Sequence, residues 1–270
     1  MNHRGNTVEA MTPTLPIIDL QLIRQVLELL RRSRSILFIT GAGLSADSGL
    51  PTYRGIGGLY ENRDTDENFP IEVLLSGEGF AARPELTWKY LLQIEQAGRS
   101  ATPNRGHEVI AEMESHFERV WVLTQNVDGF HRRAGSRNVI DIHGDLHQIR
   151  CTRCAFGQIV ADYTEFSIPP RCPDCRGLLR PNVVLFGERL PARQLATYQE
   201  ETRRGFDLVI SIGTTSAFPY IAAPVLDAYH FRKPSVEINP CETDVSEFVA
   251  VKIRNRAAPV LDAIWSAFNA

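Results

Sequence analysis

The stretch SILFITGAGLSADSG, from Ser35 to Gly49, decides the fold class of this 270-residue chain. It begins with a short apolar run bounded by glycine, which is typical of a strand buried in a parallel sheet. The glycines that follow let the chain turn tightly, so backbone N–H groups can approach phosphate oxygens. The turn departs from the G-x-G-x-x-G pattern of dehydrogenases, and no short helix leads to an acidic ribose clamp. We therefore expect an α/β fold that holds a dinucleotide differently from a hydride-transfer cofactor.

Similar apolar runs recur along the chain and alternate with helical stretches. The runs are RVWVLT (119–124), NVIDIH (138–143), DLVISIG (207–213), PSVEIN (234–239) and FVAVKI (248–253). Helical spacing marks residues 107–117, 219–230 and 257–268, and Asp19 is placed to cap another helix that runs to about Ser33. This alternation predicts an open, mostly parallel sheet with helices on both faces.

Two insertions break the alternation and predict a smaller lobe over the sheet. Residues 56–103 are polar at first and then helical, and residues 149–180 hold four cysteines with little apolar periodicity. The large domain then comprises residues 17–55, 104–148 and 181–270. Residues 1–16 lack the apolar core of a secretory signal and are expected to form a flexible leader.

Composition excludes several classes of protein. The formal net charge of -3 gives no sign of attraction to nucleic acid. No apolar run approaches the ~20 residues needed to span a bilayer. Cysteines in C-x-x-C pairs fit metal binding in a reducing compartment better than a disulfide framework, so we expect a cytoplasmic protein.

The cysteine spacing C-x2-C-x17-C-x2-C predicts a zinc site. Four thiolates in two pairs complete a tetrahedral shell and leave no position for a reactive water, so the metal is expected to be structural. The ligands are Cys151, Cys154, Cys172 and Cys175. Cys241 stands apart and is expected to be an ordinary thiol.

His143 ends one predicted strand, where an open parallel sheet places its ligand crevice. Its ordinary pKa near ~6.5 suits a general base at neutral pH. Asn126 and Asp128, in the motif TQNVD, bring hydrogen-bonding groups to the same edge of the sheet. The motifs GTTS (213–216) and IN (238–239) also follow strands and can bind ribose, phosphate or adenine. The other histidines have no comparable setting; they are His3, His107, His116, His131, His147 and His230.

Taken together, these ordered motifs resemble those of the sirtuin family of NAD-dependent protein-lysine deacylases, in its bacterial form. The resemblance runs from about Ser35 to the C-terminus and includes IHG (142–144) and VVLFGE (183–188). It implies a Rossmann-like NAD-binding domain with a smaller lobe that carries zinc and helices.

The resemblance also implies roles for individual residues, with His143 as the catalytic base. The NAD cradle would include Gly41, Ala42, Gly43 and Ser45, with Tyr53 and Arg54 in a cofactor loop. The group around nicotinamide and its ribose would be Gln125, Asn126 and Asp128. Adenosine-side contacts would be Gly213, Thr214, Thr215, Ser216, Asn239 and Ala257. A substrate peptide would pair as an added strand with Val184, Phe186, Gly187 and Glu188.

By the same resemblance, departure of nicotinamide makes the ribose carbon electrophilic enough for an acyl-lysine oxygen to attack. His143 then draws a proton from the ribose hydroxyls, and the products are free lysine, nicotinamide and O-acyl-ADP-ribose. Asn126 is counted with His143 in the catalytic group. An apolar tunnel around the acyl-lysine keeps water away from the reacting atoms.

Three departures from the family pattern matter. Tyr53 stands where phenylalanine is usual, and GTTSAFPY differs from the commoner GTS run. Relatives that remove succinyl or malonyl groups carry a Tyr-x-x-Arg pair, and here Leu91 and Ile94 occupy those positions. A buried acidic acyl group would lack a charge partner, so we expect neutral acyl groups, acetyl first.

Other functions remain open on the sequence alone. NAD-dependent transfer of ADP-ribose to protein, or NAD hydrolysis, shares the first bond cleavage but needs no acyl-lysine. A zinc-ribbon module for nucleic acid would use a modest basic set, Arg150, Arg153, Arg171 and Arg176, and would show salt-sensitive affinity. A dehydrogenase is the least favoured alternative.

Overall fold

The computed structural model describes residues 18–52 and 65–270, so the predicted leader and the residues Tyr53 and Arg54 lie outside the described residues. Its larger sheet has six parallel strands in the order β3-β2-β1-β7-β8-β9. The strands are β1 (Ser35–Thr40), β2 (Arg119–Thr124), β3 (Val139–Asp141), β7 (Leu208–Ile212), β8 (Ser235–Ile238) and β9 (Val251–Ile253). Each lies within one of the six apolar runs, which confirms the predicted parallel sheet.

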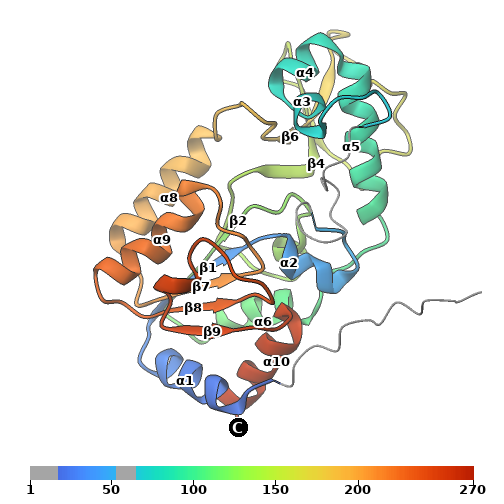
Figure 1. Cartoon of the computed structure of the whole chain (residues 1–270). Coiled ribbons are helices and arrows are strands. Elements are labelled where there is room, and N and C mark those ends of the chain that lie inside the picture. The colour runs from blue at the N-terminus through green and yellow to red at the C-terminus, as the bar shows by residue number, and fades with distance from the viewer. Residues whose placement is uncertain (1–17, 53–64) are drawn as a thin grey trace, which may run out of the picture.

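Helices cover both faces of this sheet (Figure 1). On one face lie α1 (Leu20–Arg31), α6 (Arg105–Met113) and α10 (Ala257–Phe268), and on the other lie α8 (Ala192–Arg204) and α9 (Pro219–His230). Side chains alternate along β1. Ile36 and Phe38 therefore pack in the hydrophobic core on the side of α1, α6 and α10, while Leu37 and Ile39 pack in the core on the side of α8 and α9. The side chain of Asp19 accepts a hydrogen bond from the Gln21 amide at 2.8 Å, which confirms it as the cap of α1.

The second lobe combines helices with a small antiparallel sheet in the order β5-β4-β6. Its elements are α3 (Ile71–Leu74), α4 (Gly77–Ala82), α5 (Pro84–Gly98), β4 (Gly144–Cys151), β5 (Gly157–Ile159) and β6 (Leu179–Val183). Trp88 of α5 is fully buried in this lobe, and its indole N–H donates to the Leu179 carbonyl at 2.9 Å. That bond fixes the helices to the small sheet.

The remaining short elements are α2 (Ala42–Ser45), α7 (Phe130–Arg133) and the 3-10 turns η1 (Ala46–Ser48) and η2 (Ser246–Phe248). Of these, α2 and α7 directly follow the loops at the ends of β1 and β2, where the polar motifs gather. Within the described ranges, no helix combines the length and apolar character needed to cross a membrane.

Candidate active site

The glycine turn after β1 packs directly against the loop after β7. The Gly43 amide donates to the Gly213 carbonyl at 2.8 Å, and a Cβ on Gly43 would lie 2.6 Å from the Gly213 Cα. Gly213 itself has φ +58, a left-handed conformation that favours glycine. Two motifs that are 170 residues apart therefore form one continuous backbone surface at the carboxyl edge of the sheet.

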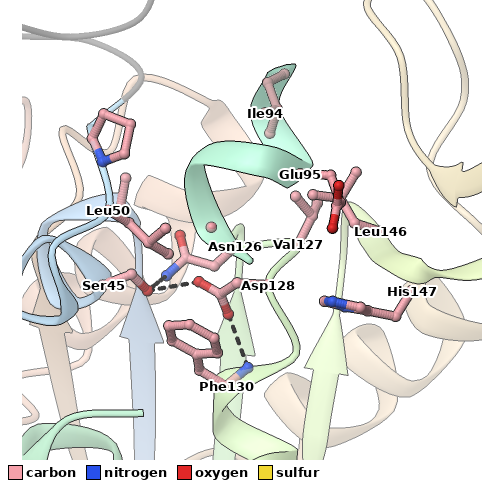
Figure 2. A pocket seen from close by; sticks show the side chains of 13 residues that line it. Ser45, Leu50, Ile94, Glu95, Asn126, Val127, Asp128, Phe130, Leu146 and His147 are labelled. Carbon is pink, nitrogen blue, oxygen red and sulfur yellow. Dashed lines mark hydrogen bonds between the residues drawn. The ribbon is translucent and has the colours of Figure 1, made fainter. Parts of the chain in front are cut away.

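Asn126 links the ends of β1 and β2. Its side-chain N–H group donates to the Gly41 carbonyl at 3.0 Å and to the Ser45 hydroxyl at 3.1 Å. The Ser45 hydroxyl in turn donates to Asp128 at 2.7 Å, and the other Asp128 oxygen accepts from the Phe130 amide at 2.9 Å (Figure 2). Burial raises the pKa of Asp128, while these two hydrogen bonds oppose the rise. The structure thus brings Ser45, Asn126 and Asp128 together in one network.

Thr214 organises the neighbouring corner of the crevice. Its hydroxyl accepts from the Gln125 side chain at 2.7 Å, and its carbonyl accepts from the Asn239 side chain at 3.0 Å. Ser216 is buried and its hydroxyl has no hydrogen-bond partner among the described residues, whereas Thr215 is exposed. Thr214 and Ser216 therefore face inward, and Thr215 does not.

His143 follows β3, and its ring lies between the end of β2 and helix α9. Its Nδ1 is 3.1 Å from the Gln125 carbonyl, and its Nε2 is 2.6 Å from the Tyr220 hydroxyl. Because a carbonyl only accepts, Nδ1 carries the hydrogen and the neutral ring presents its lone pair at Nε2. Burial lowers the pKa of His143, although the bond to Gln125 opposes this. The imidazole is therefore held neutral, with its basic nitrogen at Tyr220.

A pocket beside this network draws its walls from both lobes (Figure 2). Its lining residues are Ala42, Ser45, Leu50, Pro51, Ile94, Glu95, Gly98, Asn126, Val127, Asp128, Phe130, Leu146 and His147. His147, to which the sequence analysis gave no setting comparable with that of His143, turns its ring toward this pocket. A hydrogen bond from His147 to Asp145 raises the pKa of that imidazole. Glu95, also unpredicted, is buried and pairs with Arg99 at 2.6 Å.

The segment predicted to bind a peptide follows β6. Both backbone polar groups of Phe186 are already paired, the amide with the Leu75 carbonyl at 2.9 Å and the carbonyl with the Gly77 amide at 3.1 Å. The Val184 amide donates to the His143 carbonyl at 2.9 Å, and the Glu188 carboxylate binds Arg180 at 2.6 and 2.9 Å. This segment therefore connects the small lobe to the position of His143.

The four cysteines of the two pairs come together at the far end of β4. The Sγ atoms of Cys151 and Cys175 are 3.5 Å apart, those of Cys154 and Cys172 are 3.6 Å apart, and all four lie within 4.8 Å of one another. A tetrahedron with Zn–S bonds of ~2.3 Å has edges of about 3.8 Å, so the cluster fits one zinc ion. Cys241 is exposed and outside this cluster, as expected.

The structure also allows a test of whether these residues fit NAD. A polar crevice at the carboxyl edge of the sheet is formed by the touching glycine turns, the inward amides of Asn126 and Asn239, and the buried Ser216 hydroxyl, which has no partner in the described part of the chain. Ala257, the first residue of α10, is buried near the same edge. Such crevices are where open α/β sheets bind nucleotides. The residues therefore fit a dinucleotide.

Comparison with known proteins assigns the chain to a family. Residues 41–218 match the model of the Sir2 family, so the chain belongs to that family. It is 49% identical to a protein named NAD-dependent protein deacylase 2 from Pseudomonas aeruginosa, over 90% of this chain and 96% of that one.

Solved structures give the same assignment. A Sir2 homologue in complex with NAD has a TM-score of 0.81 and 33% identity, covering 99% of this chain and 96% of that one. A Sir2 variant with a deacetylated p53 peptide and 3′-O-acetyl ADP ribose has a TM-score of 0.80 and 29% identity, covering 91% and 98%. The predicted fold, a Rossmann-like sheet with a smaller cysteine-bearing lobe, is therefore confirmed.

Proposed function

We propose that the protein removes acyl groups from protein lysines with NAD as co-substrate, releasing nicotinamide and O-acyl-ADP-ribose. The observation that carries this proposal is the setting of His143, a neutral imidazole beside the Asn126–Ser45–Asp128 network in a crevice shaped for a dinucleotide. A Sir2 homologue binds NAD, and another Sir2 structure holds a deacetylated peptide with acetyl ADP ribose. NAD supplies an electrophilic ribose carbon when its bond to nicotinamide breaks.

Other steps of the reaction depend on residues of the chain itself, which bind, orient and deprotonate the reactants. The carbonyl of Gln125 fixes the His143 tautomer, so Nε2 is the atom that takes a proton from a ribose hydroxyl. Asn126 and Ser45 hold the Asp128 carboxyl in place before any ligand binds, which lowers the cost of ordering the site. Thr214, Ser216 and Asn239 would hold the adenosine side, and the cysteines would hold zinc away from the reacting atoms.

A release assay separates this function from its runner-up, transfer of ADP-ribose or plain NAD hydrolysis. We expect nicotinamide to be released from NAD only when an acetyl-lysine peptide is present, in equal amount to the deacetylated peptide. Mass spectrometry of both products measures this ratio. Nicotinamide release at the same rate without the peptide would favour NAD hydrolysis instead.

We also propose a preference for neutral acyl groups, acetyl first, from the walls of the pocket. The charged side chains among its described lining residues are Glu95, Asp128 and His147, and Asp145 already binds His147. Among the described residues of this lining, an acidic acyl end would therefore meet carboxylates without a free cation, which costs several kcal/mol. At 1.4 kcal/mol per factor of ten, we expect acetyl-lysine to react about 100-fold faster than succinyl-lysine on the same peptide.

A matched pair of variants tests the pocket wall. Ile94→Arg adds a cation to a wall where the charged groups of the described lining are Glu95, Asp128 and the already paired His147, so we expect it to raise the succinyl rate and lower the acetyl rate. Gln93→Arg adds the same charge on the exposed side of α5 and is expected to change neither rate. Faster cleavage of succinyl-lysine than acetyl-lysine by the unaltered protein would contradict the preference. A cytoplasmic location stays a prediction from the cysteine pairs.

A further inference from the structure

The hydroxyl of Tyr220 is hydrogen-bonded to the basic nitrogen of His143. This hydroxyl lies 2.6 Å from Nε2, while Nδ1 faces the Gln125 carbonyl. In this tautomer Nε2 has one in-plane lone pair, and the Tyr220 hydroxyl donates to it. A second hydroxyl cannot bond to the same lone pair at the same time. A ribose hydroxyl therefore reaches the base either by displacing the phenol or through it.

Ring contacts hold the phenol of Tyr220, and a hydrogen bond holds its backbone. Its ring stacks on Phe218 with centroids 5.5 Å apart and 16° between the planes, and His143 stands edge-on to both rings. The Tyr220 carbonyl accepts a hydrogen bond from the Tyr198 hydroxyl of α8 at 2.9 Å. Displacement would break the stack and the bond to Nε2 together, so transfer through the phenol is favoured.

We propose that Tyr220 relays the proton from the ribose hydroxyl of the co-substrate to His143, a role that rests on the deacylase function proposed above. The ribose O–H bond breaks as a new O–H bond forms on the Tyr220 oxygen. The original phenol proton moves to Nε2, and the ribose oxygen attacks the acyl carbon. Tyrosine starts and ends neutral, and His143 ends as imidazolium. No oxidant, reductant or further reactant is needed.

The environment of Tyr220 fits a concerted transfer. Burial raises the pKa of Tyr220 to about 12, so the phenol stays protonated at neutral pH and is a poor base by itself. A relay that passes both protons together never forms the phenolate. The phenol oxygen also keeps lone pairs that can accept from a second hydroxyl while its own hydrogen points to Nε2.

The test variant is Tyr220→Phe, which keeps the ring stack and removes the hydroxyl. We expect deacylation turnover to fall about 10- to 100-fold, within the range of general-base effects. Exchange of labelled nicotinamide into NAD in the presence of acetyl-lysine peptide precedes proton removal, so we expect it to be unchanged. Tyr229→Phe, on an exposed side chain of the same helix, is the matched control.

Two further measurements distinguish a relay from a structural role. In the ligand-free protein, the ¹⁵N resonance of His143 Nε2 should shift toward that of an unbonded imidazole nitrogen in Tyr220→Phe but not in Tyr229→Phe. In mixtures of light and heavy water, deacylation by the unaltered protein should show a curved proton inventory, and the variant a linear one.

Three outcomes would overturn the relay. They are unchanged or faster deacylation by Tyr220→Phe, an Nε2 resonance that does not move, and loss of nicotinamide exchange together with deacylation in the folded variant. If the unaltered protein gave neither exchange nor deacylation, the proposed function would fail, which is a separate result.

Discussion

Replacing His143 by alanine is expected to lower deacylation turnover by about 10²–10⁴-fold or more while the protein stays folded. The variant loses the nitrogen that finally accepts a proton when the ribose hydroxyl is deprotonated, and it leaves the Asn126–Ser45–Asp128 network intact. The fold should persist because His143 is only partly buried and the zinc cluster is remote from it. Turnover of an acetyl-lysine peptide and thermal unfolding measure the two effects.

The matched control for this variant is His230→Ala. His230 is exposed at the end of α9, so its loss should leave turnover and unfolding unchanged. Near-normal deacylation by a folded His143→Ala protein would refute the assignment of the base.

The pH dependence of the reaction gives an independent check on the same residue. A general base acts in its neutral form, so activity falls as pH drops through its pKa. Burial lowers the pKa of His143 from 6.5, and the acid limb of kcat/KM should therefore lie below pH 6.5. The pKa of His147 is raised by its bond to Asp145. A limb above pH 6.5 would point to His147 instead.

Cys172→Ser is expected to remove the zinc and destabilise the small lobe. A structural zinc site contributes apparent binding free energies of about 10–16 kcal/mol, which is comparable with the whole stability of a domain. Cys172 is fully buried, so an unpaired serine hydroxyl adds a further cost. We expect the zinc content to fall from one per chain to near zero, Tm to drop by about 10 °C or more, and deacylation to be lost.

Cys241→Ser is the natural control because Cys241 is exposed and outside the cluster. It should keep its zinc, its Tm and its activity. Elemental analysis and calorimetry of both variants give the comparison. A Cys172→Ser protein that kept stoichiometric zinc would show that the remaining thiols hold the metal without it.

The sequence predicted the large sheet because its strands are buried on both faces and read as unbroken apolar runs. It predicted the zinc ligands because thiolate pairs have few other uses in a reducing compartment. By contrast, α8 went unpredicted, since the one buried residue on that helix is Glu201, and an apolar stripe is what periodicity detects. The short antiparallel sheet was missed for a similar reason, because β5 is exposed throughout.

The sequence predicted those site residues that belong to recognisable motifs, and it did not predict the others. Ser45, Asn126 and Asp128 belong to two motifs that parallel neighbouring strands bring together. Tyr220 and His143 are 77 positions apart, and no spacing rule joins a residue in the first turn of α9 to the end of β3. The pairing of Phe186 with residues 75–77 likewise depends on how the insertions fold.

One strand connects the catalytic histidine to the predicted zinc site. β4 starts directly after His143 and ends on the zinc ligand Cys151, and its pairing with β6 shifts register between Asp145 and Ile149. The cysteine cluster and the His143 imidazole thus flank the two ends of one strand. We therefore expect zinc binding at Cys151 to restrict the end of β4 and, through the chain, the backbone next to His143.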